Sequence, residues 1–198
     1  MFILNTSCLI KVNNIYPKNH TFKLNTTYGP PTKVVQHQIE NNKILMVKHI
    51  FRHGKQYVLS EPMFRSVCQK GNMELVKLMI EQGATYWSWG LAGACEGGHM
   101  ELVKLMIEKG DTNCDWGLEY ACKGGQLELV KLMIEQGATS WDYGLHGACE
   151  GGYMEIVKLM IEKGATDWNG GLHGACLGGY MDIVQLMIEK GSTSWDYG

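Results

Sequence analysis

The chain has 198 residues, 45% of them apolar and 19% charged, and its net charge is −2. This composition supports a buried core and excludes a disordered tail, and no apolar run approaches the roughly 20 residues of a membrane-spanning helix. Charge is uneven: residues 1–62 carry 8 Lys and Arg against 2 Asp and Glu, whereas residues 63–198 carry 10 against 18. The acidic part repels phosphate backbones, so we expect neither nucleic acid nor a membrane as a partner.

The first 33 residues show no repeated pattern. Phe2-Ile-Leu, Cys8-Leu-Ile and Thr21-Phe-Lys-Leu24 are short runs separated by Asn-rich turns, which predicts a small irregular segment with short strands. Residues 34–62 are different, because Val47-Lys-His-Ile-Phe-Arg-His-Gly54 resembles a stretch found later in the chain. We interpret 34–62 as a degenerate repeat that caps the C-terminal part of the chain.

The rest of the chain is built from repeats. Gly-Leu pairs and single cysteines recur every 27 residues, and the last two copies agree at 20 of 27 positions. Of the 25 glycines, 23 follow position 62, which also separates this part from the first. The register defines five units, 63–89, 90–116, 117–143, 144–170 and 171–197. A short period of this kind indicates stacked supersecondary units.

Each unit predicts two helices. In the second unit, Leu91–Cys95 is a short helix of small residues closed by Gly97-Gly98, and His99–Lys109 is a second helix that Gly110 ends. Glu101, Lys104 and Glu108 are the polar positions of the second helix, so we expect that helix to be buried over most of its circumference. Residues 111–116 are predicted to form a loop. One such pair cannot bury its apolar surface alone, whereas stacked pairs can.

These units resemble ankyrin repeats. Ala94-Cys95, Gly98-His99 and the stretch Glu101–Gly110 look like the two-helix core of that family. The usual ankyrin period is about 33 residues, and the missing residues fall in the loop that forms the projecting hairpin finger. The resemblance therefore implies an all-α, ankyrin-type α-solenoid of stacked helix-turn-helix units with reduced fingers.

The resemblance also implies a function. Ankyrin arrays are non-enzymatic modules that bind protein partners, so we expect no catalytic residues and no cofactor. The pattern Gly-Ala-Cys-x-Gly-Gly, with Ala-Thr-x-Trp in the loop, is similar to ankyrin arrays of giant amoeba-infecting DNA viruses. This implies a viral protein that acts on host factors. An adaptor that recruits a target to a larger complex, and a partial repeat-family copy without activity, remain alternatives.

The seven cysteines favour packing over metal ligation. Equivalent residues of stacked helices lie roughly 8–10 Å apart, whereas a disulfide needs Cα atoms within about 7 Å. No Cys-x-x-Cys motif and no secretory signal is recognisable. We therefore expect no metal, an intracellular and reducing compartment, and the host cytoplasm if the protein is viral. The column is Cys68, Cys95, Cys122, Cys149 and Cys176.

Methionine and the loop tryptophans are interpreted as packing residues. A column of methionines, one in each predicted second helix, is expected to fill the core. A tryptophan recurs in the loop column at 87, 141, 168 and 195, where Cys114 is the exception, and it is expected to join loop to loop.

Columns that change between units indicate where a partner could bind. They lie along one side of a solenoid, where half-exposed aromatic residues anchor interfaces. Drift at solvent-facing positions gives the same pattern, so both interpretations stay open. The candidate partner-binding residues are Trp89, Glu96, Trp116, Glu119, Lys123, Tyr143, His146, Glu150, Tyr153, His173, Leu177 and Tyr180.

The last unit keeps its apolar residues unchanged in type. Leu177 even replaces the charged residue found at positions 96, 123 and 150. Terminal units normally carry polar residues on their outer face, so an exposed apolar end is expected here. Such a surface marks an interface or an aggregation liability. The sequence thus predicts either end-to-end association of the C-terminal repeat with a second copy or with a partner, or a shortened relative of a longer array. The protein partner of the array itself is unidentified and is expected to be basic or mixed in charge.

Overall fold

A computed structural model describes residues 59–110 and 113–193. The chain divides into two compact units, residues 1–58 and 59–198, and all described helices belong to the second unit. The predicted irregular segment 1–33 and all but the end of the predicted capping repeat 34–62 lie outside the described residues.

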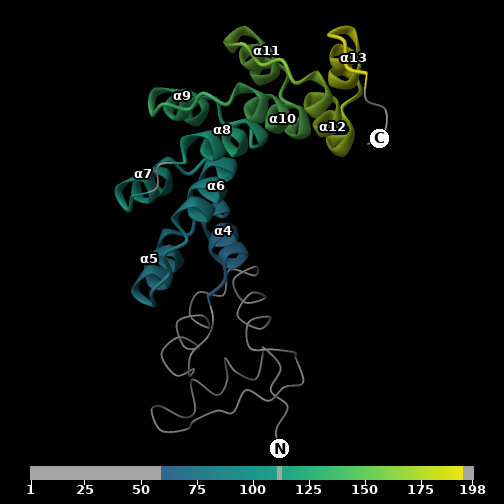
Figure 1. The fold of residues 1–198 in the computed structure, drawn as a ribbon. Helices are drawn as coiled ribbons and strands as arrows, with labels where there is room; N and C mark the ends of the chain where they lie inside the picture. Colours follow the sequence, from purple (N-terminus) through teal and green to yellow (C-terminus); the bar gives the residue numbers. More distant parts are fainter. Residues whose placement is uncertain (1–58, 111–112, 194–198) are drawn as a thin grey trace, which may run out of the picture. The chain divides into compact units, whose positions relative to one another are not determined.

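The described part is entirely helical and consists of five helix pairs, which confirms the predicted all-α fold (Figure 1). The first helices of the pairs are α4 (Glu61–Gln69), α6 (Trp87–Gly97), α8 (Cys114–Lys123), α10 (Trp141–Gly151) and α12 (Trp168–Gly178). The second helices are α5 (Met73–Glu81), α7 (Met100–Glu108), α9 (Leu127–Glu135), α11 (Met154–Lys163) and α13 (Met181–Glu189).

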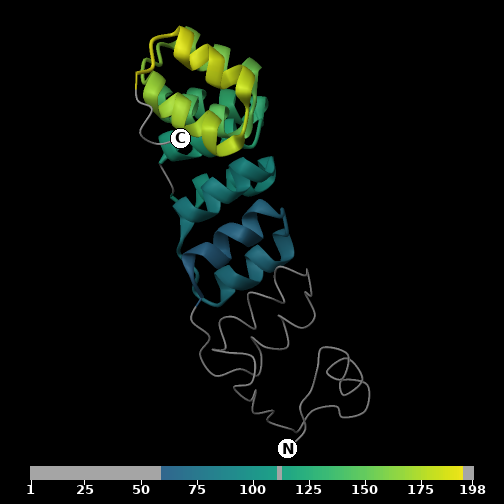
Figure 2. The same cartoon turned by 90° about the vertical axis from the view of Figure 1, so that its right-hand side faces the viewer.

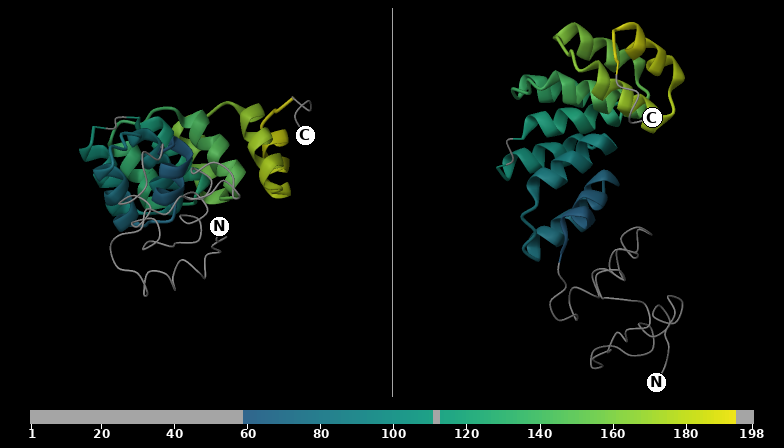
Figure 3. Two further views of the ribbon diagram at one scale, coloured as in Figure 1. Left: turned by 90° about the horizontal axis from the view of Figure 1, so that it is seen from below. Right: turned by 45° about the vertical axis from the view of Figure 1, so that its right-hand side comes forward.

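The two sets of helices play different parts in the stack. Each first helix packs closely against the first helix of the next pair, and each second helix packs mainly on its own first helix. Figure 1 shows the first helices in a continuous row from which the second helices fan outward, and Figure 2 shows the described helices stacked in chain order. Figure 3 shows the same helices from below and obliquely.

The core lies between the two sets and follows the 27-residue register. The predicted methionine column of the second helices is fully buried at Met79, Met106, Met133, Met160 and Met187. Four members of the cysteine column, Cys68, Cys95, Cys122 and Cys149, are also buried and free of disulfides. Burial raises the pKa of the Cys68 and Cys149 thiols to about 12, as expected for packing residues. The fifth member, Cys176, is exposed.

The first helices begin earlier than the sequence predicted. The tryptophan column opens these helices at 87, 141 and 168, and Cys114, Asp115 and Trp116 are helical where a loop was expected. Side-chain caps explain part of the difference. The Asn113 side chain accepts from Trp116 N at 3.1 Å, and Asp167 accepts from Gly170 N at 2.9 Å. Such caps stabilise a helix start.

The second helices are less buried than predicted. In α7 only Leu102, Val103 and Met106 are buried, while Leu105 and Ile107 are half-exposed. The cause is their outward position, which leaves one flank of each helix to solvent. The polar stripe behaves as expected for a solvated face, with Lys104 paired to Glu101 at 3.3 Å.

Three of the short loops that replace hairpin fingers, those at residues 139–140, 166–167 and 192–193, are each held by one side chain. In α8, α10 and α12 the second residue of the helix accepts backbone N–H groups from the next loop. Asp115 Oδ1 accepts from Thr139 N at 2.7 Å and Ser140 N at 2.8 Å. Asp142 binds its loop in the same way, and Asn169 Oδ1 accepts from Thr193 N at 3.0 Å. These bonds join neighbouring units where the fingers would otherwise do so.

Replacing Asp115 with alanine is expected to destabilise the fold by about 1–2 kcal/mol, because two backbone donors lose their acceptor. Asp115→Asn is the matched control: it should cost less than about 0.5 kcal/mol, since an amide oxygen at position 169 serves the same role. Urea denaturation at pH 7 measures both variants. Equal losses in the two would contradict this role for the side-chain oxygen.

Folding also affects the acidity of Asp115. Burial alone would raise its pKa, but the N–H groups of Ser140 and Thr139 outweigh burial and hold the pKa below its ordinary value. The charge therefore contributes stability above the ordinary aspartate pKa of about 3.9. That contribution is lost as the pH falls through the lowered value.

Candidate interaction surface

One face of the first helices gathers most of the residues that vary between units. Positions such as 89, 92 and 96 are separated by three and four residues, so they lie on the same helix face. The equivalent positions in the other units are 116, 119 and 123, then 143, 146 and 150, and finally 170, 173 and 177. Ala92 is buried in this row, while its counterparts Glu119, His146 and His173 are half-exposed. We call this the first-helix face.

An aromatic cluster occupies the N-terminal half of the first-helix face. Trp89 and Trp116 meet edge to face with ring centroids 5.1 Å apart, and Trp116 meets Tyr120 in the same way at 5.7 Å. The Arg65 guanidinium lies 4.3 Å from the Tyr120 ring centroid. The rings are half-exposed. This cation–π cluster (Arg65, Trp89, Trp116 and Tyr120) joins three units and presents aromatic edges to solvent.

Tyr120 explains why the cluster forms at this place. The equivalent positions in the second, fourth and fifth units are Gly93, Gly147 and Gly174. A Cβ atom on Gly147 would lie 2.2 Å from the carbonyl oxygen of Glu119, so those helices approach backbone to backbone. With a tyrosine instead, α6 and α8 pack less closely than the other neighbouring first helices.

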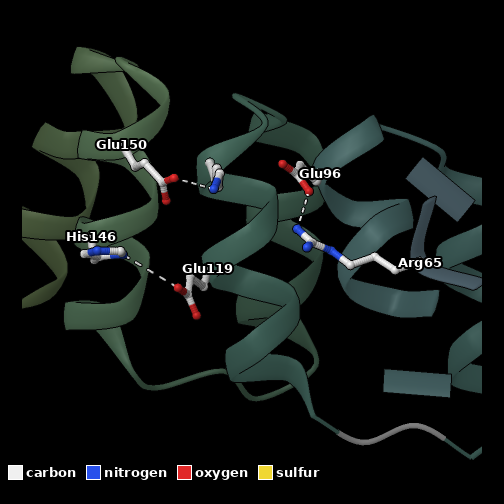
Figure 4. Close-up of polar contacts among 6 residues, drawn as sticks. Arg65, Glu96, Glu119, His146 and Glu150 are labelled. Carbon is white, nitrogen blue, oxygen red and sulfur yellow. Dashed lines mark hydrogen bonds and ion pairs between the residues drawn. The ribbon is translucent and has the colours of Figure 1, made fainter. Parts of the chain in front are cut away.

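Ion pairs between units occupy the rest of this face (Figure 4). Arg65 contacts Glu96 at 2.6 Å, and Lys123 contacts Glu150 at 2.5 Å. All four side chains are at least two-thirds buried, so these pairs are less screened by solvent than surface pairs. Three predicted binding residues, Glu96, Lys123 and Glu150, therefore stabilise the stack itself.

His146 connects three units. Its Nδ1 atom lies 3.6 Å from a Glu119 carboxylate oxygen, and its ring stacks on that of His173 with centroids 5.7 Å apart. The contact with Glu119 raises the pKa of His146 above its ordinary value, although burial opposes the shift. Glu150 adds to the rise and Lys123 reduces it.

A pH-dependent contribution to stability results from this pair. Because the folded pKa of His146 is raised, its contribution is complete below the unfolded pKa and is lost as the pH rises through the folded value. His146→Gln should thus cost up to about 1 kcal/mol at pH 5.5 and less at pH 8.5. Thermal denaturation at the two pH values measures the difference.

His99→Gln is the control for that measurement. His99 contacts the neutral carbonyl of Gln69 at 2.9 Å, and glutamine already occupies the equivalent position 126. This variant removes a histidine whose printed contact involves no carboxylate, so its cost at the two pH values is the background against which the His146→Gln costs are compared. A pH-independent cost for His146→Gln would argue against the charged pair.

The remaining predicted residues lie in three places. Tyr143 belongs to the first-helix face, one unit beyond Trp116, and is 59% exposed. Tyr153 and Tyr180 lie instead at the start of second helices, over glycine turns of the preceding unit. Leu177 lies at the end of the described stack and is 62% exposed. The structure therefore does not gather all twelve residues into one patch.

Sequence reasoning missed two members of the cluster, Arg65 and Tyr120. Tyr120 carries a detectable signal, because it interrupts a column that otherwise holds glycine in the second to fifth units. Arg65 lies in the column of Ala92, Glu119, His146 and His173, which varies between units, so a signal was present but had not been extended to the first unit. It reaches diagonally to Glu96 and across to the third unit.

The described residues also bear on two expectations from the sequence, that the protein binds no metal and has no membrane partner. Among residues 59–110 and 113–193, no group of three His, Cys, Asp or Glu side chains is arranged to hold a metal ion. In the same residues, every helix is too short or too polar to cross a bilayer.

Comparison with known proteins identifies the family of this chain. The family model described as Ankyrin repeats (3 copies) matches residues 66–143 and 118–196. No curated protein matches the chain significantly. Among solved structures, the crystal structure of the human ASB11 ankyrin repeat domain is similar, with 19% identity and a TM-score of 0.48, over 80% of this chain and 84% of that one. The match to the family model spans well over half of the sequence, and the chain belongs to the ankyrin repeat family.

Proposed function

We propose that this protein is a non-enzymatic binding module that holds a protein partner on its first-helix face. Ankyrin repeats generally serve as protein–protein interaction modules, which supports the class of function. The observation that carries the proposal is the cation–π cluster together with exposed Tyr143. Aromatic and arginine side chains are the residues that most often dominate binding energy at interfaces.

The chemistry of the face also indicates the partner. The ion pairs hold much of its charge in contacts between units, and they would have to break before they could serve a partner. The aromatic edges and Tyr143 need no such exchange. We therefore expect apolar side chains or proline residues of the partner to contact the rings. Basic groups of the partner would lie near the net-acidic array that surrounds the cluster.

The setting is part of the proposal. The Gly-Ala-Cys-x-Gly-Gly pattern supports a viral protein that acts on host proteins, and buried thiols such as Cys68 and Cys149 support a reducing compartment. An adaptor would use the same face to hold its target.

Capture from host-cell lysate tests the proposal. Tyr143→Ala is the sharpest variant, because this exposed side chain can be removed with little effect on the fold. It should reduce the yield of a specifically captured protein by about tenfold, as loss of an interface anchor does. The control is Glu128→Ala on the outer face of α9, where the carboxylate is exposed. Equal capture by both variants, with unchanged helical circular dichroism, would contradict binding at the first-helix face.

A further inference from the structure

One column of the first-helix face is aromatic in three successive units. Trp89, Trp116 and Tyr143 occupy equivalent positions of α6, α8 and α10. The two indole rings are half-exposed and meet edge to face with their centroids 5.1 Å apart, and Tyr143 is 59% exposed. Because α6, α8 and α10 are consecutive members of the row of first helices, this aromatic column (Trp89, Trp116 and Tyr143) crosses the row (Figure 1). A partner that follows the column therefore runs across the helices.

The side-chain polar groups of the aromatic column are not used within the described fold. The indole N–H groups of Trp89 and Trp116 and the Tyr143 hydroxyl form no hydrogen bond with any residue of 59–110 or 113–193. An indole nitrogen only donates, and a phenol hydroxyl can donate as well as accept. The column thus offers three hydrogen-bond donors beside apolar rings. Its occupant must supply acceptors that are not already bonded.

The spacing of the units selects the backbone conformation of the occupant. Neighbouring helices pack about 8–10 Å apart, so the aromatic column repeats at about that distance. A polyproline II helix has three residues per turn, and every third residue returns to the same face after about 9.3 Å. Same-face residues of a strand recur after about 6.7 Å, and one turn of an α-helix rises about 5.4 Å. Of these three repeats, the polyproline II turn is the one that matches the unit spacing.

The free donors favour the same conformation. An α-helix uses its backbone carbonyl groups internally, so its side would leave the indole N–H groups without backbone acceptors. A polyproline II segment has no internal hydrogen bonds, and its carbonyl groups stay available. Proline carries no backbone N–H, so a proline-rich segment brings acceptors to the indoles without adding donors of its own at those residues. Aromatic surfaces bind such segments at a low entropic cost because the segments are ordered before binding.

Charge at the Tyr143 end of the aromatic column indicates what flanks the prolines. Neither α10 nor α12 contains lysine or arginine. Asp142, next to Tyr143, and Asp167, in the following loop, are both exposed. Their side chains accept backbone N–H groups at 2.6–2.9 Å, but they form no ion pair within the described residues. A basic side chain of the occupant just beyond Tyr143 would therefore meet two carboxylates that no cation neutralises.

We propose that the aromatic column binds a proline-rich segment in the polyproline II conformation, with a proline at every third position and a basic residue beyond Tyr143. This inference rests on the proposed function, because it names the kind of partner that the first-helix face holds. Successive prolines pack on the rings of the column, and carbonyl groups between them accept from the indole N–H groups of Trp89 and Trp116. The ion pairs that join the units stay intact in this arrangement.

Two peptides of identical composition test the fit. The probe, Arg-Ala-Ala-Pro-Ala-Ala-Pro-Ala-Ala-Pro-Ala-Ala-Arg, has its prolines three residues apart. The control, Arg-Ala-Pro-Ala-Ala-Ala-Pro-Ala-Ala-Ala-Pro-Ala-Arg, has them four apart, so each proline of the control faces a different side of the polyproline II helix. The ¹⁵N-labelled full chain is titrated with each peptide. NMR follows the indole N–H signals of Trp89 and Trp116, which the single variants Trp89→Phe and Trp116→Phe assign.

The probe should shift both indole signals saturably and bind about fivefold or more tightly than the control, since one proline of the control faces the column at a time. Tyr143→Ala should weaken binding of the probe about tenfold, as loss of an interface anchor does. Asp142→Asn should weaken it about two- to fivefold at low salt, because the amide keeps the acceptor for Thr166 N and Asp167 N but removes the charge. Glu128→Ala, on the outer face of α9, is the matched control and should leave binding unchanged.

Failure of this inference differs from failure of the proposed function. If Tyr143→Ala abolishes capture of a host protein but the probe shifts neither indole signal, the first-helix face holds a partner of another conformation and the proline-rich assignment is overturned. Equal binding of probe and control overturns it as well, because the three-residue spacing then has no effect. Binding of the probe that Tyr143→Ala leaves unchanged places the peptide elsewhere and also overturns the inference. Preference for the probe together with its loss in Tyr143→Ala supports the inference.

Discussion

Gly124→Ala is expected to destabilise the array by about 2–3 kcal/mol, because one methyl group would be forced into a closely packed interface. A Cβ atom at this position would lie 2.1 Å from the carbonyl oxygen of Glu96. That neighbour is backbone, so it cannot move aside without shifting α6 against α8. At this chain length the loss corresponds to a drop in Tm of roughly 5–10 °C. Thermal unfolding followed by circular dichroism measures it.

Gly137→Ala is the matched control for this result. Gly137 has φ +99° and no heavy atom within 4 Å of its Cβ position, so alanine there carries a conformational cost of about 1–2 kcal/mol and no collision. Gly124 has an ordinary φ of −81°, so its cost is steric alone. If Gly124→Ala is the milder of the two variants, close backbone approach does not control the stacking of these units.

The repeat made most of the fold predictable from the sequence. A 27-residue register with one apolar helix per unit leaves few ways to bury that surface, and stacked helix pairs are the way observed. Gly110 ends its helix with φ +101°, as expected from its place after an apolar run. The burial of Met106 and its counterparts results from the same periodicity.

The starts of the first helices were predicted wrongly because the same residue types occur in loops and at helix caps. Asn113 and Asp167 are loop formers by composition, yet each caps a helix through its side chain. A sequence alone does not show which use prevails. The burial of α7 was overestimated for another reason: periodicity identifies an apolar flank, but not whether a neighbouring element covers it.

The candidate site was less predictable than the fold. Variation along the column Glu96, Lys123 and Glu150 was compatible with binding or with drift, and the structure adds ion pairing between units as a third cause. The change of sign between Lys123 and Glu150 is the sequence signal for that pairing. Arg65 pairs with Glu96 along a diagonal of 31 residues, which a comparison at 27-residue spacing does not detect.

The second large effect on the free energy of unfolding is expected for variants of Met160 and Gly144, which are in contact. Met160 is fully buried, and a Cβ atom on Gly144 would lie 2.5 Å from its Sδ atom. Met160→Ala should cost about 2–5 kcal/mol through lost burial and a cavity. Gly144→Ala should cost about 1–3 kcal/mol, because the new methyl group collides with the sulfur atom.

The double variant, Met160→Ala with Gly144→Ala, shows whether the two single variants lose stability through this one contact or independently. With Met160 truncated, the methyl group of Gly144→Ala enters space that the sulfur atom has left, since the next heavy atom, Leu118 Cδ2, is 3.4 Å from its position. The combined cost should therefore fall short of the sum of the single costs by about 1–2 kcal/mol. Urea denaturation of the four proteins at one temperature completes the cycle. Additive costs would mean that glycine is needed at 144 for a reason other than the methionine, and the same test can then be made on the equivalent pair, Gly117 and Met133.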